Sequence, residues 1–128
     1  MEPLGIVLYG YAKDQALAIE ASLKRLLGRD VILISASGRE DETVDEIIDA
    51  EGNAVFEKRE DRVLMFLGFD DDQIALAMDD FSGDGPLPRP IFCGLTEENH
   101  RWKFSYLLEH LLEEHRRWSG PVQRTDEE

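Results

Sequence analysis

The sequence predicts an α/β fold in which one four-stranded, mainly parallel sheet is flanked by helices. Short apolar runs alternate along the chain with segments whose apolar residues recur at helical spacing. This order, strand-helix-strand-helix, occurs twice. Right-handed connections and a pseudo-twofold axis between the two halves favour the strand order 2-1-3-4. A ferredoxin-like or other mixed sheet is the alternative.

The first strand and the first helix occupy residues 6–28. Residues 6–9 form a short β-prone run that stops at Gly10, which suits a buried strand. A helix is expected to open at Asp14, because the apolar residues that follow fall on one stripe. Gly28 is placed to end this helix as a left-handed cap. The stripe consists of Ala16, Ile19, Leu23, Leu26 and Leu27.

The second strand-helix pair occupies residues 31–50. Residues 31–34 are an apolar run of strand length, closed by the sequence Ser-Ala-Ser-Gly at residues 35–38. A short and very acidic helix follows, marked by Val44, Ile47 and Ile48. Residues 51–60 are polar and contain a Gly-Asn turn signal, so we expect them to form the connector between the two halves.

The pattern starts again after the connector. Residues 63–67 form a third apolar run that ends at Gly68, and residues 91–95 form a fourth. A third helix is expected between them, ended by glycines and prolines that keep the approach to the fourth strand extended. Its apolar residues are Ile74, Ala77, Met78 and Phe81. The last helix is expected to run from about Glu97 to Trp118.

Matching segments in the two halves indicate an internal duplication. The sequence GYAKDQ at residues 10–15 aligns with GFDDDQ at residues 68–73, and each lies between a strand and a helix. We therefore expect pseudo-repeats at residues 4–50 and 61–118 within one domain of residues 1–119, followed by a flexible tail at residues 120–128. A chance match is the alternative, because any two β-turn-α units share a glycine and an acidic cap.

The second half also carries a more specific pattern. It consists of Leu67-Gly68-Phe69, an acidic helix start, Pro90-Ile91, the turn Leu95-Thr96-x-x-Asn99-x-x-Trp102 and Leu107-Leu108-Glu109. This pattern resembles an uncharacterised prokaryotic family that is classed only as a domain of unknown function. The resemblance implies a small cytoplasmic α/β protein, and it implies no activity, substrate or catalytic residue.

Composition and charge restrict the classes of function. The chain has 128 residues, with 28 Asp and Glu against 14 Lys and Arg, and a formal net charge of −14. Such a chain repels phosphate, so we expect neither nucleic acid nor an anionic membrane surface as a partner. Cys93 is the single cysteine, which excludes a disulfide within the chain. No signal peptide or membrane span is recognised, so a cytoplasmic location is expected.

A crevice at the ends of two strands is one candidate site. Ligands in open α/β sheets bind beyond the carboxyl ends of strands. If the first and third strands are neighbours, Gly10-Tyr11 and Gly68-Phe69 flank this crevice, with aromatics that line a pocket. Alternatively, both aromatics pack under their own helices. Neither turn carries a glycine-rich phosphate motif, so no nucleotide or other cofactor is expected.

Thr96 and Asn99 lie where the fourth strand becomes the last helix. Their hydroxyl and amide groups are expected to cap the N-terminus of that helix reciprocally. The alternative is that the same polar groups bind a ligand at the end of the strand.

Other groups of reactive or metal-ligating residues are incomplete. Asp70–Asp72 are consecutive, so they do not share a helix face and are expected to form a solvated helix start. His110 and His115 lie about 140° apart on a helix, and their spacing does not match that of zinc ligands. A nucleophile pair of Cys93 and His100 lacks a third group to orient it. We expect no metal site and no catalytic residue.

The last helix offers a surface for a partner. It is longer than a strand of this sheet, so its apolar stripe is expected to cover the sheet first and then to overhang. Leu111, His115 and Trp118 would form a contact with another protein or with a second copy of the chain. The alternative is that Trp118 folds back on its own domain.

Together these observations predict a non-catalytic binding or regulatory module that acts through protein contacts. The alternative is a small-molecule-binding domain or a small enzyme that uses the crevice at the carboxyl ends of the first and third strands. An enzyme requires a deep pocket with convergent polar groups and perturbed pKa values. A binding module requires instead a shallow, partly apolar surface, here expected around the last helix.

Overall fold

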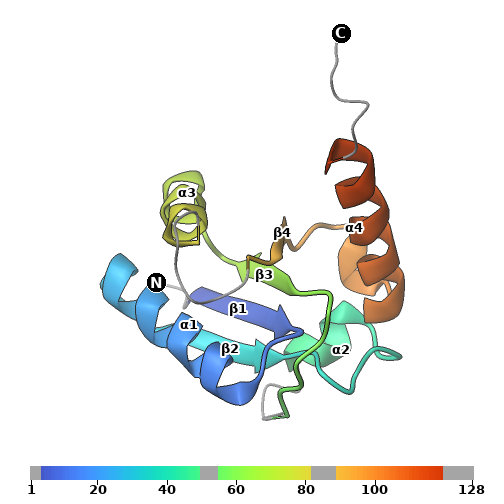
Figure 1. Ribbon diagram of the computed structural model, residues 1–128, viewed down its shortest axis with the longest axis horizontal. Helices are drawn as coiled ribbons and strands as arrows, with labels where there is room; N and C mark the ends of the chain where they lie inside the picture. The colour runs from blue at the N-terminus through green and yellow to red at the C-terminus, as the bar shows by residue number, and fades with distance from the viewer. Residues whose placement is uncertain (1–3, 50–54, 82–88, 120–128) are drawn as a thin grey trace, which may run out of the picture.

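The computed structural model describes residues 4–49, 55–81 and 89–119, without the side chains of residues 117–119. Within these ranges the chain forms a four-stranded sheet with helices on both faces (Figure 1). The strands are β1 (Leu4–Tyr9), β2 (Val31–Ser35), β3 (Val63–Leu67) and β4 (Ile91–Gly94). The helices are α1 (Lys13–Leu27), α2 (Val44–Asp49), α3 (Asp71–Asp80) and α4 (Phe104–Ser119), and a 3-10 turn at Asn99–Arg101 precedes α4.

The strand order is β2-β1-β3-β4, which confirms the order that the sequence predicts. β1 pairs in parallel with β2, and β3 pairs in parallel with β4. The central pair is antiparallel, since Gly5 lies opposite Leu67 and Tyr9 lies opposite Val63. The sheet is therefore mixed, with two parallel pairs joined by one antiparallel pair. A twofold axis that is perpendicular to the sheet and lies between β1 and β3 would relate the two halves in this way, because rotation by 180° about it reverses the direction of a strand.

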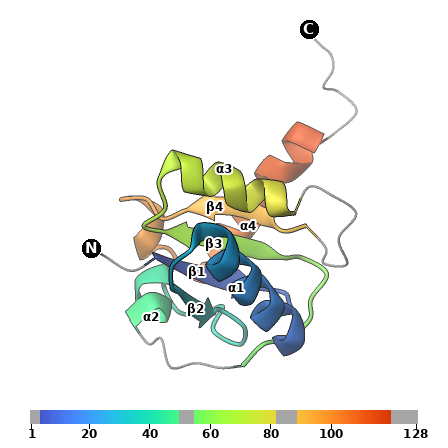
Figure 2. The same cartoon turned by 90° about the vertical axis from the view of Figure 1, so that its left-hand side faces the viewer.

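The helices form one layer on each face of the sheet. α1 and α3 lie side by side on one face, and α2 and α4 cover the other (Figures 1 and 2). Successive side chains of β1 point to opposite faces. Ile6 and Leu8 therefore pack with α1 and α3, whereas Val7 and Tyr9 pack with α2 and α4. Every residue of β1 is buried, which explains why its sequence is apolar without alternation.

The predicted caps of the first and third helices are present. Gly28 adopts a left-handed conformation with φ 68°, and its N–H donates to the carbonyl of Lys24. The Asp70 carboxylate accepts from the N–H of Gln73 at 2.8 Å, and the Gln73 side chain accepts from the N–H of Asp70 at 2.9 Å. This reciprocal capping fixes the point at which α3 leaves the end of β3.

The last helix begins later than the sequence predicts. The predicted start is near Glu97, whereas α4 begins at Phe104. A pairing with the chain before α2 explains the difference. The N–H of Val44 donates to the carbonyl of Trp102, and the N–H of Phe104 donates to the carbonyl of Glu42, both at 2.9 Å. Trp102 is therefore held in an extended conformation, with ψ 147°, which ends the 3-10 turn.

Two buried serines fasten the connector to the end of β2. The hydroxyl of Ser35 donates to the carbonyl of Val55. The hydroxyl oxygen of Ser37 accepts from the N–H of Glu57 at 3.2 Å. Both serines are almost fully buried. These bonds give buried polar groups their partners and hold the described part of the connector against the sheet.

The connector then crosses the carboxyl end of β1. The N–H of Arg59 donates to the carbonyl of Gly10 at 3.0 Å. Gly10 has φ +91°, a conformation that side chains disfavour, and a Cβ placed there would lie 2.1 Å from the carbonyl oxygen of Asp61. Only glycine therefore fits under the crossing.

Parts of the sequence prediction fall outside the described residues. They include the start of the connector, the break after the third helix at residues 82–88 and the tail at residues 120–128. The elements of each half follow the order β-α-β-α. The duplication of residues 4–50 and 61–118 within one domain stays a prediction.

Replacing Gly10 with alanine is expected to lower the free energy of unfolding by about 3 kcal/mol or more, because strain and a steric clash add. Gly28→Ala is the matched control. Gly28 also has a positive φ, but no atom lies within 4 Å of an added Cβ, so the expected loss is about 1–2 kcal/mol. Urea denaturation of both variants measures the difference. Equal losses would contradict the close crossing at Gly10.

Candidate functional site

The antiparallel centre of the sheet divides the predicted crevice between two ends. Gly10 and Tyr11 follow β1 at one end, and Gly68 and Phe69 follow β3 at the other. The prediction that these residues flank a single crevice is wrong, because the carboxyl ends of β1 and β3 point in opposite directions. The turn after β4 lies at the same end as Gly68, because β3 and β4 are parallel.

The end that carries Gly10 is filled by the chain itself. The connector crosses Gly10, and Tyr11 is buried in the core beside α1, with 1% of its surface exposed. Burial raises the pKa of the Tyr11 phenol well above its ordinary value of 10. Ser35 and Ser37 at this end bind the backbone of the connector. The polar groups here therefore serve the fold.

The turn after β4 is built as the sequence predicts, although it caps the 3-10 turn and not α4. The Thr96 hydroxyl accepts from the N–H of Asn99, and the Asn99 amide oxygen accepts from the N–H of Thr96, both at 2.9 Å. The Asn99 amide nitrogen donates to the carbonyl of Gly94 at 3.0 Å. Both polar atoms of this side chain are thus used inside the turn, which fixes the end of β4.

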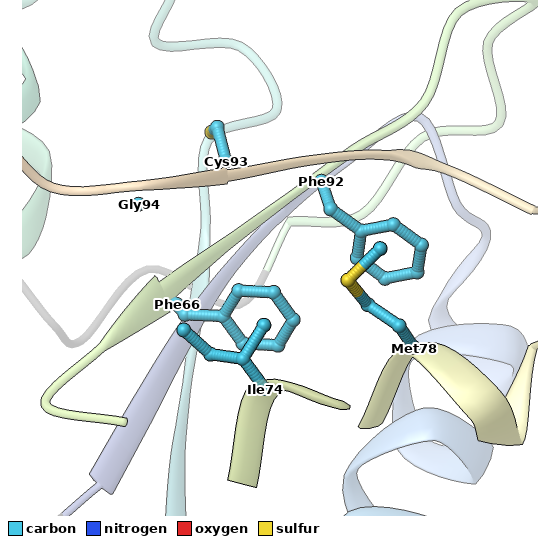
Figure 3. Close-up of a pocket in the computed structure, with 6 residues that line it drawn as sticks. All are labelled: Phe66, Ile74, Met78, Phe92, Cys93 and Gly94. Atoms are coloured by element: carbon cyan, nitrogen blue, oxygen red, sulfur yellow. The ribbon is translucent and has the colours of Figure 1, made fainter. Parts of the chain in front are cut away.

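An apolar groove lies between α3 and β4 (Figure 3). It encloses about 250 Å³ and is lined by Phe66, Ile74, Met78, Phe92, Cys93 and Gly94. The rings of Phe66 and Phe92 form its floor and are stacked, with centroids 5.7 Å apart and planes 7° from parallel. Ile74 and Met78, one turn apart on α3, point toward these rings and form its wall.

Gly94 leaves the groove open at the end of β4. Phe92 and Gly94 are two residues apart on a strand, so both lie on the face that α3 covers. Phe66 is the neighbour of Gly94 on β3. A Cβ placed on Gly94 would meet no atom within 4 Å, so the space beside it is free of described atoms.

The other end of the groove is closed by Phe81 and Arg89. The Phe81 ring meets the Phe92 ring edge-on at 5.5 Å, and the Arg89 guanidinium lies over the Phe92 ring at 5.0 Å from its centroid. The aromatic floor therefore already accepts a cation from this chain.

The open end of the groove has an acidic rim. Asp71 and Asp72 are exposed in the first turn of α3. Asp71 precedes Met78 by seven residues, which places the two about 20° apart around the helix and puts Asp71 on the groove side. The first turn of a helix also favours carboxylates through the backbone dipole. The result is an apolar cavity with negative charge at its entrance.

Cys93 lines the groove through its backbone, because its thiol points to the opposite face of the sheet (Figure 3). Burial raises the pKa of the thiol from 9.0 to about 12. The thiol is therefore protonated near neutral pH, whereas a cysteine nucleophile requires the thiolate. His100 pairs instead with Asp45 on α2, with 2.6 Å between Nδ1 and Oδ2.

The last helix places its predicted interface residues in different surroundings. Leu111 is buried in the core with the sheet, so it is already packed within this chain. His115 is exposed beside a hollow of about 360 Å³ that Asp61, Leu112 and Arg116 also line. The side chain of Trp118 lies outside the described residues.

The two histidines of the last helix do not converge. The His110 ring contacts the Trp102 ring edge-on at 5.2 Å, and its Nε2 lies 3.8 Å from a carboxylate oxygen of Glu114. His115 faces the hollow beside Asp61 instead. Within residues 4–49, 55–81 and 89–116, no group of three or more His, Cys, Asp or Glu side chains is arranged to hold a metal ion.

The groove is the feature that sequence reasoning missed. The fourth strand was expected as an apolar run, and the signal of an open site on it was the glycine that the run contains. A glycine in a strand marks a place where a side chain is missing from one face. Gly94 follows Phe92 on that face, next to a helix whose Ile74 and Met78 share one side. The sequence does not show that this helix lies beside β4.

The buried phenol and thiol predict a loss of stability at high pH. Burial and the hydrogen bond to Glu40 raise the pKa of Tyr9 to about 12. The folded chain therefore keeps protons on Tyr9 and Cys93 that the unfolded chain releases, so stability holds below about pH 9 and falls as the pH rises toward 12. Thermal unfolding between pH 8 and 11 measures this.

Tyr9→Phe and Cys93→Ala are each expected to make this fall shallower. Tyr106→Phe is the control, because Tyr106 is 55% exposed. If the stability of Tyr9→Phe and of Cys93→Ala fell with pH as steeply as that of the unchanged chain, Tyr9 and Cys93 would not be the source of the loss.

Comparisons with known proteins give a match in the second half of the chain. No helix within the described ranges combines the length and the apolar content that crossing a membrane requires. No curated protein and no solved structure matches the chain. A family model matches residues 62–117, which comprise β3, α3, β4, the 3-10 turn and most of α4, and thus every residue that lines the groove. The family is described as a domain of unknown function, DUF3783, and the match covers less than half of the chain.

Proposed function

We propose that the chain is a non-catalytic binding module that acts through protein contacts, and that the groove between α3 and β4 is its contact site. One observation supports this above all: the groove is apolar, and it opens over Gly94 at the edge of the sheet. Its volume of about 250 Å³ is below the usual range of small-molecule sites and suits an apolar side chain.

The chemistry of the lining favours binding over catalysis. Among the described residues that line the groove, Cys93 alone has an ionisable side chain, and its thiol points away with a raised pKa. Acid–base and nucleophilic catalysis both require a group within reach of the substrate. The small-molecule alternative, placed at the carboxyl ends of β1 and β3, loses its basis because these ends do not meet.

The charge of the chain favours a different protein as the partner over a second copy. The net charge is −14, and Asp71 stands on the groove side of the first turn of α3. A positively charged surface is attracted to such an entrance, whereas a second copy is repelled. Self-association through the last helix, where His115 and Arg116 border a second hollow, is the alternative contact. We place the module in the cytoplasm of a prokaryote, as the resemblance of its second half implies.

Gly94→Leu is expected to fill the groove and to lower the recovery of bound proteins at least tenfold, because the new side chain occupies the space of the partner's anchor. The measurement is cross-linking in extracts of the native host, with captured proteins quantified by mass spectrometry. Leu76→Ala is the control, since Leu76 is 46% exposed on α3 and does not line the groove.

Thermal unfolding checks that Gly94→Leu is folded, as the open space beside Gly94 predicts. Equal recovery of the same proteins with Gly94→Leu and with the unchanged chain would move the contact site away from the groove.

A further inference from the structure

Building on the proposed function, we infer that the groove receives an extended, basic segment of the partner protein, which adds to the sheet as a fifth strand beside β4. Three features of the same edge carry this: the direction of the backbone groups of β4, the missing side chain at Gly94 and the acidic rim at Asp71.

The backbone of β4 presents hydrogen-bonding groups to the open edge. β4 is the last strand in the order β2-β1-β3-β4, and among the described strands it pairs with β3 alone. The N–H of Ile91 donates to the carbonyl of Arg62 at 2.8 Å, so the backbone groups of Ile91 face β3. These groups alternate along a strand, so those of Phe92 and Gly94 face the open edge.

Part of this edge is already used, which sets the register of an incoming strand. The carbonyl of Gly94 accepts from the Asn99 amide nitrogen at 3.0 Å. The groups that point outward for a partner are therefore the N–H and carbonyl of Phe92 and the N–H of Gly94. An incoming strand that bonds with these groups is centred on Phe92, which lines the groove.

A partner strand that pairs with β4 would also place a side chain in the groove. Residues directly opposite each other on paired strands project their side chains to the same face. A partner residue opposite Phe92 or Gly94 would thus project to the α3 side, where Ile74 and Met78 form the wall. Gly94 provides the space that this side chain enters. A helical partner would need anchors spaced over two turns, whereas a groove of about 250 Å³ holds roughly one large side chain.

The charge at the open end of the groove specifies a basic segment. Asp71 is exposed there on the α3 side, so a Lys or Arg residue on the same face of the incoming strand would meet it. At the other end, Arg89 places a guanidinium over the Phe92 ring, which disfavours a second cation at that end. A second copy pairing through β4 would instead bring two copies of Asp71 together. A segment with an apolar anchor and a basic residue two positions from it fits the edge best, because residues two apart on a strand point to the same face.

A synthetic seven-residue peptide with valine at its centre, lysine two residues to either side and threonine elsewhere provides the test, with the full chain labelled for NMR. We expect it to bind, to protect the amide protons of Phe92 and Gly94 from exchange, and to lose at least tenfold in affinity with Gly94→Leu. A valine-glutamate peptide should not bind, and neither should a glycine-lysine peptide that lacks the apolar anchor.

Matched substitutions separate the rim from the overall charge. Asp71→Asn is expected to weaken binding of the valine-lysine peptide several-fold and to reduce its dependence on salt. Asp41→Asn removes one charge from an exposed position before α2, on the other side of the sheet, and should have little effect.

Each contrary result would contradict one specific part of the proposal. Binding without protection of the Phe92 and Gly94 amide protons would overturn strand addition, and equal effects of Asp71→Asn and Asp41→Asn would overturn the role of the rim. If no valine-lysine peptide binds while the recovery of partners still depends on Gly94, the partner is not an extended basic segment and the proposed function stands. If recovery is indifferent to Gly94→Leu, the proposed function itself fails.

Discussion

β1 and β3 run antiparallel at the centre of the sheet, and the placement of every loop depends on this pairing. Each of these strands has its own parallel neighbour, β2 or β4, so each half sends the turns after its strands to its own end of the sheet. At one end the connector crosses Gly10 and is tied down by Ser35 and Ser37. At the other end no segment within the described ranges crosses the sheet as the connector does, and the groove beside Gly94 stays open.

Packing makes the two halves of the sheet unequal. β1 and β3 are covered on both faces and are largely buried. β4 is short and half-exposed, and a groove remains between it and α3. Edge strands in soluble proteins are usually protected by charge, by a covering segment or by short length. Here the short length protects the edge, and in the function proposed above Asp71 selects which sequences can approach.

Much of the architecture was predictable because it is local. Apolar periodicity gave the elements, the repeated order of elements gave the strand order, and the caps at Gly28 and at Thr96 with Asn99 formed as their residue types predict. The start of α4 was not predictable, because the pairing of Trp102 and Phe104 with residues 42 and 44 joins segments far apart in the chain. The antiparallel direction of the central pair was not predictable for a related reason, since an apolar run reads the same in both directions.

The candidate site was the least predictable part. Gly68 and Phe69 follow β3 as expected, but the groove depends on how closely α3 approaches β4, which no spacing in the sequence records. Leu111 was expected at a surface, yet it packs on the sheet because α4 lies along that face. Its burial shows that an apolar stripe on a long helix does not by itself mark the point where the core ends.

The antiparallel pairing of β1 with β3 also means that the first half of the chain covers one edge of the second half. The segment that the family model matches, residues 62–117, contains β3 and β4, but not the neighbour that β3 has on its other side. Without β1, the backbone of a strand as apolar as Val63–Leu67 would face water along one whole side, and such an edge invites aggregation. Residues 4–9 occupy that edge in register from Gly5 to Tyr9. The first half thus covers this edge of β3 permanently. Among the described strands of the second half, β4 is left as the edge strand.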